Sequence, residues 1–288
     1  MADAPASRCC ALKELMTSDI LLRNNVKVLG EGTQPMMFAH GFGCDQNMWR
    51  LMVPAFSSDY RVILFDYVGA GKSDWSAYTP ERYSSLDGYA RDVLEICEAL
   101  DLTQVIFVGH SVSGMIGALA AIQAPERFAQ LILVSPSPSY LNELPEYRGG
   151  FERAEIEGLL GMMDKNYMSW ANTLAPLIMQ NADRPGLTQE LEQSFCSTDP
   201  VIARRFAEVT FFSDNRRDLP NVPVPSLILQ SAVDAIAPVE VGQYMHRHMP
   251  ASTLQLMQVT GHCAHMSHPQ ETIQQIKAYL SAARAGLN

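Results

Sequence analysis

The chain has 288 residues, of which 47% are apolar and 18% are charged. It can therefore bury the core of one large α/β domain, and it is neither disordered nor fibrous. Asp and Glu number 31 against 21 for Lys and Arg, and the formal net charge of −10 repels phosphate backbones and anionic lipid surfaces. We expect neither a nucleic acid nor a membrane as a partner.

Residues 1–16 are small and polar and show no strand or helix periodicity, so we expect them to form a mobile tail. They lack the cationic start and apolar stretch of a signal peptide, and no apolar run in the sequence approaches the ~20 residues that span a bilayer. The six cysteines form no CxxC pair, which indicates reduced thiols. We expect a cytoplasmic protein.

Short apolar, β-rich runs alternate with helical periodicity, a pattern typical of a mostly parallel sheet flanked by helices. A helix over Leu86–Leu100 has one apolar stripe, and Pro269 opens a C-terminal helix. We assign residues 17–135 and 220–288 to this α/β core. The predicted strands are Val26–Leu29, Met36–Ala39, Val62–Phe65, Val105–Val108, Leu131–Val134, Ser226–Gln230 and Thr253–Val259.

Residues 136–219 lose the strand signal, and helical pieces separated by Pro and Gly replace it, which predicts an inserted helical lid. The pieces are Glu152–Met163, a stretch around Tyr167–Met179, Thr188–Phe195 and a helix that Asp199 caps and Pro200 begins. Large apolar side chains on such a lid either line a substrate pocket or pack helix against helix. The pocket candidates are Tyr140, Trp170, Met179 and Phe195.

Ser111 is the candidate nucleophile. The strand Val105–Val108 runs into Gly-His-Ser-Val-Ser-Gly at 109–114, where the tight strand-to-helix turn needs small neighbours and exposes the serine. The match to G-x-S-x-G is imperfect, because Ser113 takes the place of the second glycine and Gly114 comes one residue late. Serine is still small, so we expect the turn to form.

A serine hydroxyl needs a base that an acid orients, and in this kind of fold the two follow the serine in the order acid, then base. Asp234 is the only carboxylate in the loop after the strand Ser226–Gln230. His262 lies just past the next strand, 28 residues after Asp234. We predict that Asp234 orients His262 and that His262 is the general base. The order of the three residues, each just past a strand, favours a serine, aspartate and histidine triad.

A glycine-flanked loop, His40-Gly-Phe-Gly43, follows the strand Met36–Ala39 and can turn free backbone N–H groups towards a developing oxyanion. We assign these donors to the backbone N–H groups of Phe42 and of Val112, the residue after the nucleophile.

Together, HGFG, GHS, a downstream acid and a final GH make the chain resemble an α/β-hydrolase. A closer resemblance from Met16 onwards is to the RsbQ-like family of bacterial stress-signalling hydrolases, and a more distant one is to the plant karrikin and strigolactone receptors, which share Gly-His-Ser-Val-Ser. The matching segments include Asn24-Asn-Val-Lys-Val, Met37-Phe-Ala-His-Gly-Phe-Gly-Cys-Asp-Gln, Arg61-Val-Ile-Leu-Phe-Asp, Cys196-Ser-Thr-Asp-Pro and Gly261-His-Cys-Ala-His-Met-Ser-His-Pro.

The resemblance implies a triad of Ser111, Asp234 and His262 under a four-helix lid, above a small hydrophobic cavity. It also implies hydrolysis of a small hydrophobic ester or lactone without a cofactor, in the service of signalling through a sensor-domain serine/threonine phosphatase. The chain departs from the RsbQ-like pattern at Ser113, where that family has glycine, and at Val233, where it has a second acid.

Other interpretations of the same residues are weaker. His262, Cys263, His265 and His268 suggest zinc, but their spacing fits no usual zinc motif, and His265 is a second choice as base. Gly69-Ala-Gly-Lys-Ser73 suggests a phosphate loop, but its first glycine would fall on Asp66. The main alternative in function is a ligand-binding signalling protein that hydrolyses its ligand slowly or only once.

Overall fold

The computed structural model describes residues 17–285, so the tail predicted for residues 1–16 lies outside the described residues. A single seven-stranded sheet runs through the molecule in the order β1-β3-β2-β4-β5-β6-β7, and all its strands are parallel except β1, which is antiparallel to β3. The strands are β1 (Lys27–Leu29), β2 (Pro35–Ala39), β3 (Arg61–Leu64), β4 (Val105–His110), β5 (Phe128–Val134), β6 (Ser226–Val233) and β7 (Ser252–Thr260). The expected mostly parallel α/β fold is confirmed.

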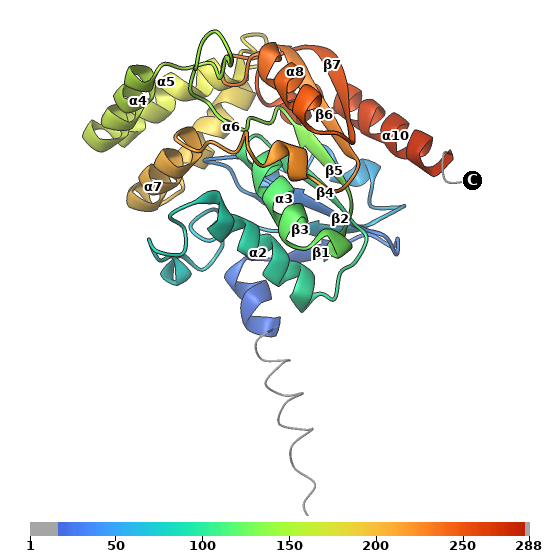
Figure 1. Ribbon diagram of the computed structural model, residues 1–288. Helices are drawn as coiled ribbons and strands as arrows, with labels where there is room; N and C mark the ends of the chain where they lie inside the picture. Colours follow the sequence, from blue (N-terminus) through green and yellow to red (C-terminus); the bar gives the residue numbers. More distant parts are fainter. Residues whose placement is uncertain (1–16, 286–288) are drawn as a thin grey trace, which may run out of the picture.

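Helices cover both faces of the sheet, which is why β2 and β4 are buried along their whole length (Figure 1). Alternate side chains of each strand enter two separate cores. Phe38 packs in the core that holds Ile276 of α10, whereas Met37 packs in the core that holds Val93 of α2. The flanking helices are α2 (Leu86–Ala99), α3 (Val112–Gln123), α8 (Val239–His248), the short α9 (Ala264–Ser267) and α10 (Pro269–Ala285).

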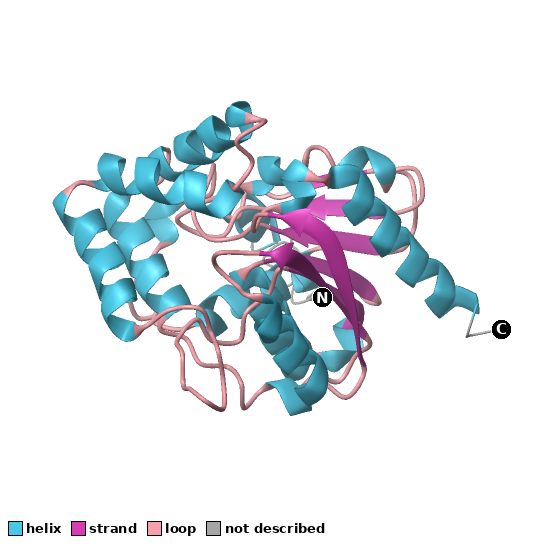
Figure 2. Ribbon diagram, turned by 90° about the horizontal axis from the view of Figure 1, so that it is seen from above, coloured by secondary structure: helices cyan, strands magenta, loops and turns pink. Residues whose placement is uncertain are grey.

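Four further helices form an insertion between β5 and β6. Figure 2 shows them gathered on one side, where the arrowheads of the strands point towards them. Asp199 caps the last of the four as predicted, accepting hydrogen bonds from the N–H groups of Val201 (2.9 Å) and Ile202 (3.1 Å). The helices are α4 (Arg153–Lys165), α5 (Tyr167–Met179), α6 (Pro185–Cys196) and α7 (Pro200–Phe211). The third begins at Pro185 rather than at Thr188, because proline is well tolerated in a first helical turn.

A short helix over 17–23 precedes the sheet, and the sequence pattern did not predict it. Its contacts are with distant residues: Arg23 forms ion pairs with Asp92 (3.4 Å) and Glu95 (2.7 Å) of α2. The adjoining Asn24 donates hydrogen bonds to the carbonyl of Asp66 (3.0 Å) and to the carboxylate of Asp92 (3.3 Å). Within residues 17–285, no helix is long and apolar enough to cross a membrane.

Candidate active site

Ser111 lies at the sharp turn between β4 and α3, with φ of 57° and ψ of −125°, a strained backbone conformation for a residue other than glycine. The turn requires close packing of the backbone on both sides. A Cβ atom on Gly109 would lie 2.5 Å from the carbonyl oxygen of Ser113, and one on Gly114 would lie 2.7 Å from Pro136. The two glycines therefore allow α3 to start directly beside β4 and β5, and the turn holds the serine at the carboxyl end of β4.

Three side chains from three strand ends form one hydrogen-bonded chain. The Oγ atom of Ser111 lies 2.8 Å from Nε2 of His262, and Nδ1 of His262 lies 2.8 Å from Oδ2 of Asp234. The other oxygen of Asp234 accepts the N–H groups of Ile236 (2.8 Å) and Ala237 (3.1 Å). All three triad candidates are at most 9% exposed. This arrangement is consistent with a catalytic triad, because the carboxylate is held in place by the backbone and can orient the imidazole.

The backbone of His262 is held from two sides. Its carbonyl accepts a hydrogen bond from Nε2 of His110 (3.0 Å), and its N–H donates to the carbonyl of Ile178 in α5 (2.9 Å). Gly261, with φ of 103°, lets the inserted helices approach this closely, because a Cβ atom there would lie 2.2 Å from the carbonyl oxygen of Met179. The end of α5 therefore rests directly on the loop that carries the histidine.

Two backbone N–H groups flank the serine without a partner. Within residues 17–285, neither the N–H of Phe42 nor that of Val112 donates a hydrogen bond. Val112 is fully buried in the first turn of α3, and Phe42 follows β2, the strand next to β4. Free donors beside a nucleophile are the arrangement that binds an oxyanion, since buried N–H groups otherwise find an acceptor.

Ser113, the residue that departs from the glycine pattern, connects the two segments that carry these N–H groups. Its hydroxyl donates to the carbonyl of His40 (2.5 Å) and accepts from the hydroxyl of Tyr67 (2.9 Å). The N–H of Tyr67 in turn donates to Nε2 of His40 (3.2 Å), so Nδ1 of that histidine carries the proton and donates to the carbonyl of Gly41 (2.9 Å). This buried network joins the start of α3 to the loop after β2.

We expect Ser113→Ala to lower kcat about ten-fold with little change in KM, because the loss of the bond to His40 lets the two N–H groups move apart and each such donor contributes ~10²–10³ in rate. Tyr67→Phe is the matched control, since it removes a hydroxyl from the same network but leaves the bond to His40 intact. Its kcat should stay within about three-fold of wild type. The measurement is kcat per titrated active site, and equal losses in the two variants would contradict the expectation.

A cavity of about 20 Å³ lies beside the serine. Of the predicted pocket residues, Tyr140 and Phe195 line it, and the Tyr140 hydroxyl lies 3.3 Å from Oγ of Ser111. Burial raises the pKa of Tyr140, so its hydroxyl stays protonated and available as a donor. Trp170 and Met179 are not among the lining residues: the Trp170 ring packs behind the wall, 5.0 Å from the ring of Phe195.

Most of the lining was not predicted, because it comes from side chains that only the packing of α5, α6 and α7 against the core brings together. Ile236 had a signal in the sequence, since it follows Asp234 by two residues in the same loop. The lining residues not named in advance for the pocket are Cys44, His110, Ile178, Leu191, Thr210, Phe211, Ile236 and Cys263.

The geometry does not support the zinc site, the phosphate loop or His265 as the base. His265 is fully buried between Trp49 and His110, with ring centroids 4.5 Å away on both sides, and neither of its ring nitrogens has a hydrogen-bond partner. In the turn after β3, Asp66 accepts the N–H of Lys72 (2.9 Å), a group that a phosphate would otherwise need. Within the described part of the chain, no group of three or more His, Cys, Asp or Glu side chains could hold a metal ion.

Comparison with known proteins identifies the class. The family model described as alpha/beta hydrolase fold matches residues 34–269. The chain therefore belongs to the α/β-hydrolase family, and it is a hydrolase of that fold.

Particular relatives match along most of their length. The chain is 41% identical to the karrikin insensitive 2 receptor CA of Petunia hybrida over 251 residues, which cover 87% of this chain and 93% of that protein. It is 40% identical to a strigolactone esterase of Pisum sativum, covering 92% of this chain and 100% of that protein. The solved structure of a hydrolase from Oleispira antarctica is similar with a TM-score of 0.90 and 47% identity, over 92% of this chain and 97% of that one.

Proposed function

We propose that the protein is a serine hydrolase, of esterase or lactonase type, that acts on a small hydrophobic ester through Ser111, His262 and Asp234. The observation that carries this proposal is the buried hydrogen-bonded chain from Ser111 Oγ through His262 to Asp234, with two 2.8 Å contacts. The two free N–H groups beside the serine support it, as do relatives named as a strigolactone esterase and as a karrikin insensitive 2 receptor.

The geometry suits acyl transfer. Ser111 attacks the carbonyl carbon while His262 takes its proton, and Asp234 stays ionised and stabilises the imidazolium. The oxyanion forms between the N–H groups of Phe42 and Val112. His262 then returns the proton to the leaving oxygen, and a water molecule activated by the same histidine releases the acid from the serine.

The apolar lining indicates the substrate class. Phenylalanine, leucine and isoleucine side chains line the cavity together with two cysteines, and its polar groups are those of Ser111, His262, His110, Tyr140 and Thr210. A site of this kind favours an uncharged ester or lactone over a charged substrate, because a buried charge would have no partner there. We propose no cofactor for the reaction.

The test is hydrolysis of p-nitrophenyl acetate together with labelling by a fluorophosphonate, which reacts with activated serines. We expect many turnovers per enzyme molecule, and a single adduct that mass spectrometry of peptides locates at Ser111. A label on another residue, or no label on an active enzyme, would refute the assignment.

A second candidate function is ligand-dependent signalling in which hydrolysis is slow or occurs once. The observation that favours it is the hydrogen bond from the N–H of His262 to the carbonyl of Ile178, because it couples the triad to the inserted helix α5. On this proposal the partner is a sensor-domain serine/threonine phosphatase of a bacterial stress response, or another protein that recognises the helices. A burst of one p-nitrophenolate per enzyme without further turnover would support it, whereas sustained turnover favours the first proposal.

A further inference from the structure

The cavity beside Ser111 is too small for any ester. Its volume of about 20 Å³ is enough for about one water molecule. A substrate can therefore bind only if part of the wall moves aside. The wall on the β-sheet side is formed by the triad loops and by β4, which are held by the ladder of the sheet. The wall on the side of α6 is formed by the side chains of Leu191 and Phe195.

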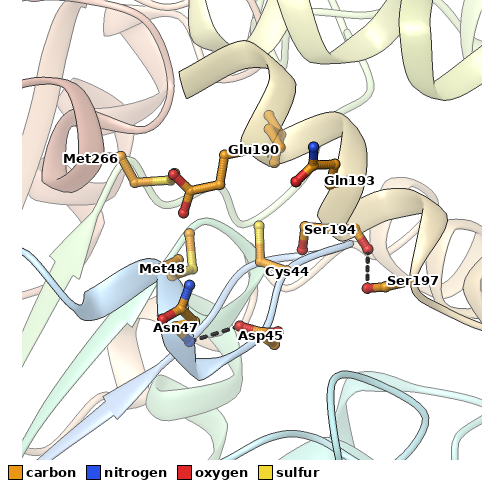
Figure 3. Close-up of a pocket in the computed structure, with 10 residues that line it drawn as sticks. Cys44, Asp45, Asn47, Met48, Glu190, Gln193, Ser194, Ser197 and Met266 are labelled. Carbon is orange, nitrogen blue, oxygen red and sulfur yellow. Dashed lines mark hydrogen bonds between the residues drawn. The ribbon is translucent and has the colours of Figure 1, made fainter. Parts of the chain in front are cut away.

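A second pocket of about 230 Å³ lies on the outer side of that wall, between α6 and the segment after β2 (Figure 3). Glu190 and Gln193 of α6 face Asn47 and Met48 across it. Asn47 and Gln193 are exposed, so this outer pocket opens to solvent. Its lining residues are Cys44, Asp45, Asn47, Met48, Glu190, Leu191, Gln193, Ser194, Ser197 and Met266.

The two hollows share two lining residues, Cys44 and Leu191, which therefore form the partition between them. Both side chains are buried, at 5% and 2% exposure. Because Leu191 lines both hollows, a rotation of its side chain or a small shift of α6 would join the inner cavity to the outer pocket. Two polar contacts join α6 to the segment after β2: Arg50 pairs with Glu190 (2.5 and 2.6 Å), and Ser194 donates to the carbonyl of Gly43 (2.8 Å).

The outer pocket lies on the side where a leaving group must sit. In the proposed acyl transfer His262 gives its proton to the leaving oxygen, so the alcohol part of the ester lies on the His262 side of the serine. The segment that follows His262 spans both hollows, because Cys263 lines the inner cavity and Met266 lines the outer pocket. The segment that follows the proton donor therefore runs from the inner cavity to the outer pocket, alongside the partition.

We propose that the outer pocket is the subsite for the alcohol part of the ester and the route by which the substrate enters. This inference rests on the proposed serine hydrolase function. The outer lining is rich in hydrogen-bonding groups, among them Asn47, Gln193 and Ser194, whereas the inner lining is mostly apolar. Of the two carboxylates in this lining, Glu190 pairs with Arg50, and Asp45 accepts the N–H of Asn47 (2.7 Å). The substrate class that fits is an ester with a small apolar acyl group and an uncharged alcohol that carries hydroxyl or carbonyl groups.

The test compares pairs of esters that differ in one part only. Leu191→Trp fills the partition, and we expect it to lower kcat/KM for 4-methylumbelliferyl acetate at least ten-fold more than for phenyl acetate. The ratio between p-nitrophenyl butyrate and p-nitrophenyl acetate, which differ in the acyl part, should stay within about two-fold of wild type. Leu191→Ala should raise kcat/KM for 4-methylumbelliferyl acetate relative to phenyl acetate. Ratios between two substrates do not depend on the fraction of folded enzyme.

The matched control is Leu160→Ala on α4, a buried leucine of the inserted helices that lines neither hollow. The alcohol ratio and the acyl ratio of kcat/KM should both remain at the wild-type value in this variant.

Gln193→Leu should lower kcat/KM several-fold for glyceryl monoacetate but not for propyl acetate. A change of acyl preference in Leu191→Trp with no change of alcohol preference would overturn the proposal. If Ser111→Ala still hydrolyses these esters, the proposed serine hydrolase function is wrong. If Ser111→Ala is inactive but the Leu191 variants keep the wild-type ratios of kcat/KM between the paired esters, only the proposed alcohol subsite is wrong.

Discussion

Replacing Ser111 by Ala is expected to lower kcat for p-nitrophenyl acetate by up to about 10⁶-fold, which is the loss seen when a serine protease is deprived of its nucleophile. The physical reason is that, among residues 17–285, only the Ser111 hydroxyl forms a hydrogen bond with Nε2 of His262 (2.8 Å). His262→Ala should have an effect of similar size, because an unactivated serine hydroxyl is a poor nucleophile at neutral pH. The combined variant should be no worse than either single one, since the two residues act as a unit.

The measurement is the steady-state rate of p-nitrophenolate release at saturating substrate, with thermal unfolding recorded for each variant. Ser226→Ala is the matched control: this serine is equally buried but lies at the start of β6, the opposite end of the strand from Asp234. Its kcat should equal that of the wild type. Substantial turnover in Ser111→Ala would show that the nucleophile is another residue.

Two buried histidines are expected to make the fold sensitive to mild acid. Burial lowers the pKa of His265 to about 3, with smaller contributions from His262 and Arg50. Burial also lowers the pKa of His110, with contributions from His265 and His262. In the unfolded chain a histidine has a pKa of about 6.5. Below that pH the unfolded state takes up protons that the folded state does not, so the free energy of unfolding falls.

The stability contributed by neutral His265 is therefore fully present above pH 6.5 and is lost progressively as the pH falls towards 3. For His265 alone the loss reaches about 2 kcal/mol at pH 5. Urea unfolding at pH 7.5 and at pH 5 measures it. His265→Phe keeps an aromatic ring against Trp49 and should make the loss between these two pH values smaller by about 2 kcal/mol. His246→Phe, at an exposed position on α8, should leave it unchanged; an equal effect in both variants would contradict the expectation.

The strands and the start of α7 were predictable because their signals are local. β2 and β4 were recognised as short apolar runs since parallel strands are buried on both faces. The capping of α7 by Asp199 involves only the four consecutive residues 199–202. The helix at 17–23 was missed because its stabilising contacts, from Arg23 to Asp92 and Glu95, join segments about 70 residues apart in the sequence.

The parallel α/β fold and the residues at the carboxyl ends of the strands could be predicted without the structure. Chain order and strand periodicity are enough for this, since parallel strands end at one edge and place Ser111, Asp234 and His262 there together. The surroundings of these three residues depend on tertiary packing. The size of the cavity, the partition formed by Leu191 and the hydrogen bond from His262 to Ile178 depend on how the four inserted helices pack. Side-chain packing between distant segments has no period along the chain, so no local pattern records it.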